Sequence, residues 1–225
     1  VALRIYISGG QGFGLTRVKQ QPNKIIYASE DIYRINDVNQ GIKVKTSSIV
    51  NPARSSGIKS NNYLPEIIAL ENAKKEEFDD VLSYNQQGEL TECLSSNVFF
   101  LSRQGDQYSF DTPALQSGLF AGIMRNNIIK MFHLATIPYQ ERVIYREEIP
   151  RFDEAFTCST LRGLMPIVMI DRHRLQTLRK NAAFWHVKRL FDSVVENKIG
   201  FRVNWQTGEK THKDEVSEKP KKSLN

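Results

Sequence analysis

The pattern of apolar and polar residues divides the chain into short strands and three helices. Runs rich in β-branched and aromatic residues predict strands at residues 3–7, 24–28, 42–44, 80–84, 90–93, 97–101, 139–145, 154–158 and 166–170. Apolar residues at helical spacing predict helices over residues 62–75, 122–132 and 182–196. The polar stretch from Thr46 to Gly57 predicts a loop that leads to Lys59. Strands and helices that alternate irregularly favour an α+β fold with mostly antiparallel strands.

A glycine-rich turn, residues 9–14, separates the first two predicted strands and indicates a hairpin. Its sequence, GGQGFG, has some of the glycines of a dinucleotide-binding loop. That loop normally opens a helix, whereas Pro22 and a second strand follow here. The turn is therefore interpreted as part of a hairpin and not as a nucleotide site.

Composition and charge exclude some classes of function. A chain of 225 residues with 40% apolar and 25% charged residues is typical of a globular protein with one large or two small domains. No apolar run is long enough to span a bilayer, so no membrane partner is predicted. The net charge of +6 is scattered, and no nucleic-acid-binding module is present. A moderately basic chain equally suits a site for a phosphate and carboxylates.

The chain contains two cysteines, Cys93 and Cys158, which show neither CxxC spacing nor a histidine at metal-ligand spacing. We therefore predict no metal site and a reduced protein located in the cytoplasm.

Two residues carry the chemistry that first defines a candidate function. Lys59 lies in IKSNNYL, and Glu92 lies in LTECLSSNVFFL, 33 positions later (92 − 59). An amine can form an imine with the aldehyde of pyridoxal phosphate, and a carboxylate can keep the pyridine nitrogen protonated. Each residue alone has an ordinary alternative, since a lysine is usually solvated and a strand glutamate is often exposed.

Two further motifs follow in the chain, TPALQSGLFAGIMR and DEAFTCSTLRGLMPIVMID. With these four segments in this order, the chain resembles the fold-type IV pyridoxal-phosphate enzymes, which include branched-chain aminotransferases, D-amino-acid aminotransferases and aminodeoxychorismate lyases. The resemblance implies a large C-terminal domain of mostly antiparallel strands with packed helices, and an N-terminal small domain that is largely absent here. We expect residues 1–45 to be a remnant of that small α/β domain, residues 46–205 to form the cofactor-binding domain, and residues 206–225 to be a disordered charged tail.

The resemblance also implies roles for single residues at the cofactor ring. Lys59 forms the imine with the cofactor and then moves the α-proton of the substrate. Glu92 pairs with the pyridine nitrogen, and Asn97 belongs to the polar turn beside it. Tyr63 is expected near the phenolate side of the ring, although branched-chain enzymes place this tyrosine one position later. Phe120 either supports the ring or belongs to the core.

The phosphate and the substrate are expected at other residues. The family binds the phosphate through the backbone amides of a helix N-terminus, which corresponds to Gly122, Ile123 and Met124. Ser159 and Thr160 match a hydroxyl pair, of which Thr160 would donate to the phosphate. The substrate-binding candidates are Arg162, whose guanidinium can form a fork with a carboxylate, and Gly163; an exposed loop arginine is the alternative.

The resulting hypothesis is a pyridoxal 5'-phosphate-dependent aminotransferase that exchanges an amino group between an amino acid and a 2-oxo acid, and that assembles as a homodimer. An aminodeoxychorismate lyase, which releases pyruvate and 4-aminobenzoate, is the first alternative, because Met124 replaces the usual threonine of aminotransferases. A truncated, non-catalytic relative is the second, because the small domain would supply an arginine that clamps the phosphate.

Overall fold

The computed structural model describes residues 2–10, 22–29, 37–48, 59–105, 107–199, 201–203 and 210–212. Its contacts divide the chain into two units, residues 1–35 and 36–225. The first unit contains β1 (Ala2–Ile7) and β2 (Lys24–Ser29), which pair antiparallel with Ala2 opposite Ser29. These strands were predicted as the two arms of a hairpin, while residues 11–14 of the glycine-rich turn lie outside the described residues.

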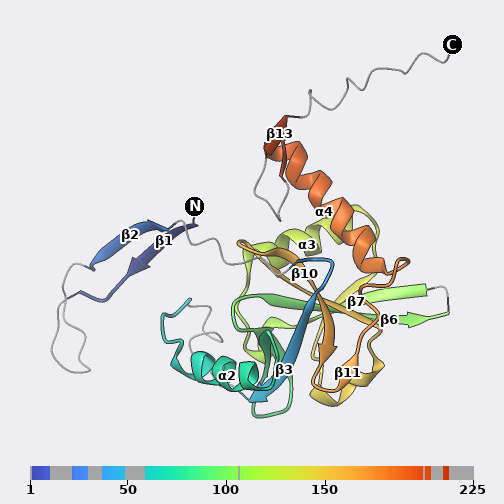
Figure 1. Cartoon of the computed structure of the whole chain (residues 1–225), viewed down its shortest axis with the longest axis horizontal. Helices are drawn as coiled ribbons and strands as arrows, with labels where there is room; N and C mark the ends of the chain where they lie inside the picture. The colour runs from blue at the N-terminus through green and yellow to red at the C-terminus, as the bar shows by residue number, and fades with distance from the viewer. Residues whose placement is uncertain are drawn as a thin grey trace. The chain divides into compact units, whose positions relative to one another are not determined.

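The second unit is built on a nine-stranded sheet (Figure 1). Its strands follow the order β5-β4-β3-β10-β9-β6-β7-β8, and β11 pairs with β10. Neighbouring strands are antiparallel except in the pairs β3/β4, β3/β10 and β7/β8. The mostly antiparallel α+β architecture agrees with the fold class predicted from the sequence. The strands are β3 (Ile42–Ser48), β4 (Asp80–Tyr84), β5 (Leu90–Cys93), β6 (Asn97–Gln104), β7 (Gln107–Pro113), β8 (Tyr139–Arg142), β9 (Glu154–Ser159), β10 (Gly163–Ile170) and β11 (His173–Arg174).

The two outer strands of this sheet meet, so the sheet is curled. The Leu90 amide of β5 donates to the Ile144 carbonyl oxygen at 2.7 Å, just after β8. The Arg146 amide donates to the Gly88 carbonyl oxygen at 2.9 Å, and Glu89 forms an isolated bridge with Tyr145. These bonds satisfy backbone groups that the edge of an open sheet would leave unpaired.

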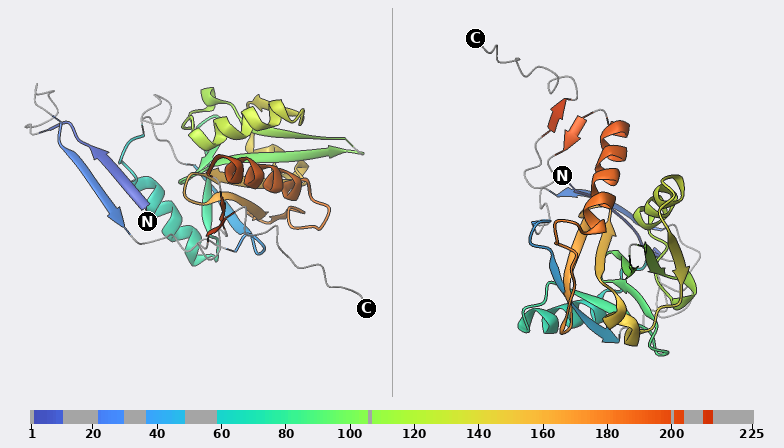
Figure 2. Two further views of the ribbon diagram at one scale, coloured as in Figure 1. Left: turned by 90° about the horizontal axis from the view of Figure 1, so that it is seen from above. Right: turned by 90° about the vertical axis from the view of Figure 1, so that its right-hand side faces the viewer.

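In the described part of the chain, three α-helices accompany the sheet: α2 (Leu64–Lys75), α3 (Ile123–Leu134) and α4 (Ala183–Ile199). Helix α2 packs beside β3 and β4, away from α3 and α4 (Figure 1 and Figure 2). The short elements are η1 (Leu115–Ser117), η2 (Arg146–Arg151), β12 (Phe201–Val203) and β13 (Lys210–His212). None of the described helices is long and apolar enough to cross a membrane.

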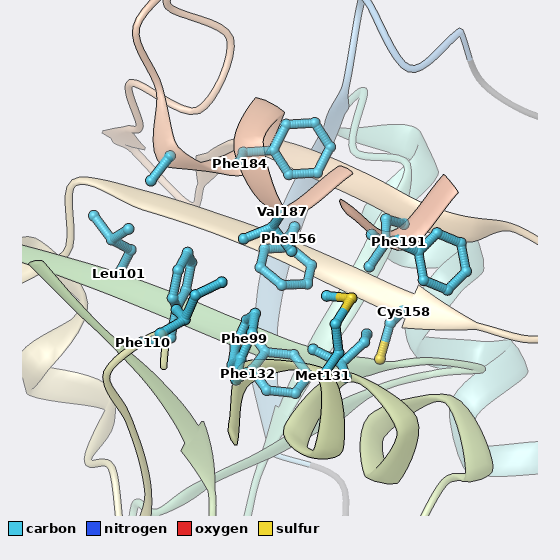
Figure 3. Packing of buried hydrophobic residues seen from close by; sticks show 14 of the residues in the cluster. Phe99, Leu101, Phe110, Met131, Phe132, Phe156, Cys158, Phe184, Val187 and Phe191 are labelled. Atoms are coloured by element: carbon cyan, nitrogen blue, oxygen red, sulfur yellow. The ribbon is translucent and has the colours of Figure 1, made fainter. Parts of the chain in front are cut away.

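Aromatic side chains form the core between α3, α4 and the sheet (Figure 3). The Phe99 and Phe156 rings stack with centroids 5.2 Å apart, and the Phe110 and Phe132 rings stack at 4.9 Å. Phe184 of α4 lies 5.8 Å from Phe156. Because these large side chains are almost fully buried, the core fixes both helices on strands β6, β7 and β9.

The structure corrects two sequence predictions, and in both cases long-range polar contacts explain the difference. Strand β7 was not predicted, because its sequence, QYSFDTP, is too polar. There the buried Thr112 hydroxyl donates to the Val98 carbonyl oxygen at 2.8 Å, and Asp111 pairs with Arg142 at 2.9 Å. Residues 46–48 belong to β3 and not to a loop, since the Thr46 amide and hydroxyl donate to the Asp171 carboxylate at 2.8 and 2.7 Å.

The domain boundaries expected from the sequence remain predictions. Strand β3 crosses the expected boundary at residue 45 and belongs to the sheet of the second unit. Within the expected tail, residues 206–225, the structure describes only β13, and the rest of that prediction lies outside the described residues.

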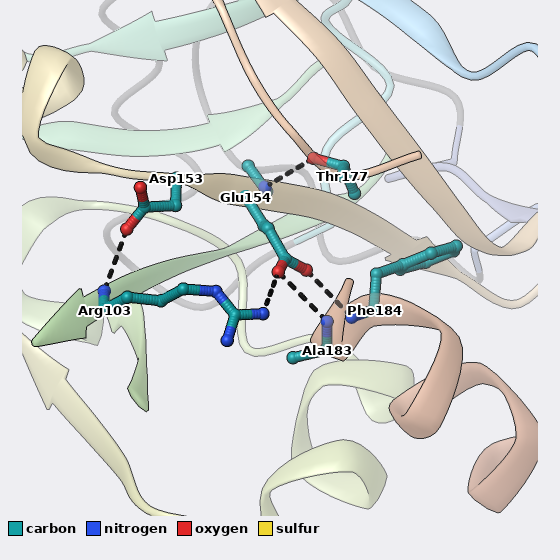
Figure 4. Close-up of polar contacts among 7 residues, drawn as sticks. Arg103, Asp153, Glu154, Thr177, Ala183 and Phe184 are labelled. Carbon is teal, nitrogen blue, oxygen red and sulfur yellow. Dashed lines mark hydrogen bonds and ion pairs between the residues drawn. The ribbon is translucent and has the colours of Figure 1, made fainter. Parts of the chain in front are cut away.

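A buried glutamate ties the start of α4 to the sheet (Figure 4). The carboxylate of Glu154, in β9, accepts hydrogen bonds from the amides of Ala183 and Phe184 at 3.0 and 2.9 Å. The same carboxylate accepts a bond of 2.6 Å from the Arg103 guanidinium. Amides in the first turn of a helix have no partner within the helix, and the positive end of the helix dipole attracts a carboxylate. Glu154 therefore fixes the position of α4.

We predict that Glu154→Ala lowers the free energy of unfolding by about 2 kcal/mol, because two helix amides and a guanidinium lose their acceptor. Urea denaturation of both proteins measures this loss. Glu71→Ala, which removes a carboxylate whose ion pair with Lys74 is exposed, is the matched control and should cost at most a few tenths of a kcal/mol. Equal stability losses in the two variants would contradict the anchoring role.

Candidate functional site

A cavity of about 270 Å³ opens where loops from four parts of the second unit meet. Small-molecule sites in proteins occupy roughly 300–1,000 Å³, so this cavity is slightly smaller than that range. The segment before α2, the turn between β5 and β6, the loop before α3 and the end of β9 form its wall. The lining residues are Lys59, Ser60, Tyr63, Glu92, Leu94, Ser95, Ser96, Asn97, Phe120, Gly122, Ile123, Met124, Cys158, Ser159 and Thr160.

Every residue that the sequence analysis expected at the cofactor lies on this wall. Antiparallel pairing explains part of the convergence, because Asn97 at the start of β6 stands opposite Cys158 near the end of β9. The predicted substrate residues, Arg162 and Gly163, do not line the cavity. The roles of all these residues remain predictions, whereas their common location is a property of the structure.

Glu92 is held in a fixed orientation. It is only 6% exposed. One carboxylate oxygen, Oε1, accepts a hydrogen bond of 3.1 Å from the Phe120 amide, and Oε2 accepts one of 3.1 Å from Nδ2 of Asn97. A buried carboxylate needs such donors, because an unpaired charge is costly away from water. The carboxylate therefore has one defined orientation at the cavity wall.

Lys59 is an exposed residue that lines the cavity, close to the same loop. Its Nζ atom is 5.3 Å from the centroid of the Phe120 ring, a distance at which an ammonium group is attracted to an aromatic face. Phe120 thus contacts both candidate residues: its ring faces the lysine amine, and its backbone amide binds the glutamate carboxylate.

Helix α3 begins at the cavity with Gly122 as its N-cap residue. No described side chain caps this end of the helix, although the Gly122 carbonyl oxygen accepts the Asn126 amide at 3.0 Å. The first amides of a helix have no partner within the helix and favour an anion. A side chain at position 122 would not fit, since a Cβ atom there would lie 2.0 Å from Oδ1 of Asn97.

Hydroxyl groups stand at the end of β9, where Ser159 is half-buried and Thr160 is exposed. The Ser159 oxygen accepts the Arg162 amide at 3.2 Å. A hydroxyl that accepts one bond can still donate its own hydrogen, so Ser159 retains a donor for a ligand.

Arg162, two residues after Thr160, forms an ion pair with β4. Its Nη1 atom lies 3.3 Å from Oδ2 of the buried Asp80, at the start of β4. Burial raises the pKa of the Asp80 carboxyl group, and the neighbouring Arg162 opposes that rise. Gly163 begins β10 with φ of +63°, a backbone conformation that favours glycine. Substrate contact by Arg162 or Gly163 stays a prediction, because the described contacts of both residues are structural.

The sequence analysis missed two features of the wall. Cys158 lines the cavity, and only the long-range pairing of β6 with β9 places it there. The backbone amide of Phe120 binds Glu92, and a contact made by a peptide group cannot be predicted from the pattern of residues. No described group of three or more His, Cys, Asp or Glu side chains is arranged to hold a metal ion.

The sequence matches the class IV amino-transferase family over residues 1–170. This chain therefore belongs to the class IV aminotransferase family. The branched-chain-amino-acid aminotransferase of Pseudomonas aeruginosa is 26% identical over 205 residues, which cover 88% of this chain and 65% of that protein. A probable branched-chain-amino-acid aminotransferase of Thermotoga maritima is 31% identical over 144 residues, which cover 62% of this chain and 50% of that protein.

The fold is also similar to a solved structure, a putative 4-amino-4-deoxychorismate lyase from Legionella pneumophila. The TM-score is 0.72 at 21% identity, and the match covers 87% of this chain and 69% of that structure. At this identity the similarity shows the fold alone. The matched regions span between one half and two thirds of the two aminotransferase relatives.

We predict that both cysteines are inert in the folded protein. Burial raises the pKa of the Cys158 thiol to about 12, so at pH 8 it stays protonated, and the thiolate is the reactive form. Cys93 is also buried. A thiol-reactive disulfide reagent at pH 8 should modify neither cysteine in the native state and both in urea. Rapid modification of Cys158 in the native protein would contradict this description of the cavity wall.

Proposed function

We propose that this protein is a pyridoxal-phosphate-dependent aminotransferase that exchanges an amino group between an amino acid and a 2-oxo acid. One observation carries the proposal: the amine of Lys59 and the carboxylate of Glu92 border one cavity, and Phe120 contacts both. Family membership supports the same class of reaction.

The groups on the wall fit the cofactor in their chemistry. When bound, pyridoxal phosphate supplies an aldehyde that reacts with amines and a ring that stores the electrons of a broken bond. The wall offers an amine at Lys59, a fixed carboxylate at Glu92, and a helix N-terminus at Ile123 and Met124. Such a helix end, with the hydroxyls of Ser159 and Thr160, suits a phosphate dianion.

Each residue then has a defined task. Lys59 Nζ would attach the cofactor covalently and would then move a proton at the α-carbon of the substrate. Glu92, whose orientation is set by Asn97 and Phe120, would accept a hydrogen bond from the protonated ring nitrogen. The amides of Ile123 and Met124 would hold the phosphate.

A lyase that releases pyruvate and 4-aminobenzoate from aminodeoxychorismate is the second candidate. It would use the same cofactor and the same lysine. Met124, at the position where aminotransferases usually have threonine, lines the cavity and favours this alternative. The similarity of the fold to a putative 4-amino-4-deoxychorismate lyase is compatible with it.

A non-catalytic role for the chain is the third candidate. It would apply if residues outside this chain must complete the phosphate site.

We also propose a homodimer as the functional assembly, on the resemblance to the family, and small-molecule amino and oxo acids as its partners.

The covalent role of Lys59 is tested by borohydride reduction in the presence of pyridoxal phosphate. We expect mass spectrometry to find the reduced cofactor on the peptide that contains Lys59. Lys59→Ala should abolish this labelling and lower transamination by at least about 10²–10⁴-fold. Lys130→Ala removes an exposed lysine of α3 that does not line the cavity, and it should leave labelling and activity unchanged.

The outcomes separate the three candidates. Conversion of the bound cofactor to its amine form by amino acids supports the aminotransferase. Release of pyruvate from aminodeoxychorismate without that conversion selects the lyase. Absence of both labelling and cofactor absorbance would favour the non-catalytic alternative.

A further inference from the structure

We infer that Asn97 is a positioning residue that sets the separation between the Glu92 carboxylate and the N-terminus of α3. The inference rests on the proposed function, because it concerns the two anchor points of the same cofactor. It goes further in naming the residue that joins those points and the bonds through which it acts.

Three hydrogen bonds form a closed ring around Asn97. Its Nδ2 atom donates to Oε2 of Glu92 at 3.1 Å and to the carbonyl oxygen of Phe120 at 2.9 Å. The Phe120 amide donates to Oε1 of Glu92 at 3.1 Å, which closes the ring. The peptide groups on both sides of the Phe120 Cα atom are thus fixed against the glutamate and the asparagine. Both Glu92 and Asn97 are buried, so these bonds lie in an environment where unpaired polar groups are costly.

Further hydrogen bonds connect this ring of hydrogen bonds to the start of α3. The Phe120 carbonyl oxygen also accepts the Gly122 amide at 2.9 Å, and the Gly122 carbonyl oxygen accepts the Asn126 amide at 3.0 Å. Oδ1 of Asn97 lies so close to Gly122 that a Cβ atom there would be 2.0 Å away. Asn97 therefore touches both ends of the proposed cofactor site, the carboxylate by hydrogen bonds and the helix start by direct packing.

The hydrogen bonds around residue 97 suit an asparagine better than other polar residues. Both partners of Nδ2, a carboxylate oxygen and a carbonyl oxygen, are acceptors. A side-chain amide offers two N–H donors, whereas a serine or threonine hydroxyl offers one, and an ionised aspartate offers none. A glutamine would place the same amide one methylene further from β6, toward the position where Gly122 leaves no space.

This arrangement has a consequence for recognition of the cofactor ring. Because both oxygens of the Glu92 carboxylate are held, its distance from the N-terminus of α3 is fixed. The site can therefore select a ligand whose phosphate and ring nitrogen are separated by the same distance. Without Asn97, Oε2 loses a donor, and the carboxylate can turn away from the ring nitrogen. Selectivity for that nitrogen should then fall, even though Glu92 itself is still present.

The test compares two ligands, pyridoxal 5'-phosphate and its 1-deaza analogue, in which carbon replaces the ring nitrogen. Their dissociation constants are measured by fluorescence quenching, without any turnover. The native protein should bind pyridoxal phosphate at least about tenfold more tightly, the ratio that corresponds to 1.4 kcal/mol. Asn97→Ala should reduce the ratio to nearly one, and in a Glu92→Gln background it should change the ratio no further.

The chain offers a matched control in Asn85. Its Nδ2 atom also joins a glutamate carboxylate, Glu89 at 2.8 Å, to a carbonyl oxygen, that of Ser117 at 3.2 Å. Asn85 does not line the cavity. Asn85→Ala should therefore keep the native ratio of the two dissociation constants, although it loses the same kind of bonds.

Gly122→Ala is the second variant and keeps the inference testable if Asn97→Ala folds poorly. The added methyl group displaces Asn97 from the opposite side, and the ligand ratio should again fall toward one. A native ratio in a folded Asn97→Ala or Gly122→Ala protein would overturn the positioning role alone. A native protein that binds neither ligand would overturn the proposed function, and the inference with it.

Discussion

The geometry of the site depends on the hydrogen bonds that hold a buried carboxylate against one peptide segment. Glu92 accepts from the Phe120 amide and from Asn97, and Asn97 also donates to the Phe120 carbonyl oxygen. A carboxylate at 6% exposure is stable only with such donors, because desolvation of a charge is costly. The loop before α3 therefore cannot move independently of β5 and β6. The same loop carries the Phe120 ring toward Lys59, so a single set of bonds orders the acid, the aromatic ring and the helix start.

The curled sheet explains how segments far apart in the sequence reach this place. Its outer strands meet through backbone bonds between the start of β5 and the segment after β8, and its core is filled by stacked phenylalanines. Glu154 anchors α4, and Asp80 binds Arg162 beside the turn that follows Ser159 and Thr160. These contacts make a rigid scaffold for the loops that line the cavity. The arrangement is consistent with the class IV aminotransferase family, to which the chain belongs.

The sequence predicted most elements and ten of the residues that line the cavity, because apolar periodicity and four ordered motifs are local signals. It did not predict β7, in which Thr112 and Asp111 find their partners in β6 and β8. The extension of β3 to Ser48 depends on Asp171, which is 125 residues away from Thr46. The ion pair of Arg162 with Asp80 and the contact of the Phe120 backbone with Glu92 were missed for the same reason. Contacts between distant residues, and contacts made by peptide groups, leave no pattern in the sequence. The residue types that suit a cofactor do form such a pattern.

We propose that Lys59 and Glu92 act on opposite sides of one ligand ring. A crystal structure of the protein with pyridoxal phosphate tests it most directly. We expect Nζ of Lys59 to be bonded to the aldehyde carbon, a Glu92 oxygen to lie within hydrogen-bond distance of the ring nitrogen, and the phosphate to lie at the amides of Ile123 and Met124. A cofactor bound elsewhere, or one whose ring nitrogen faces away from Glu92, would contradict it.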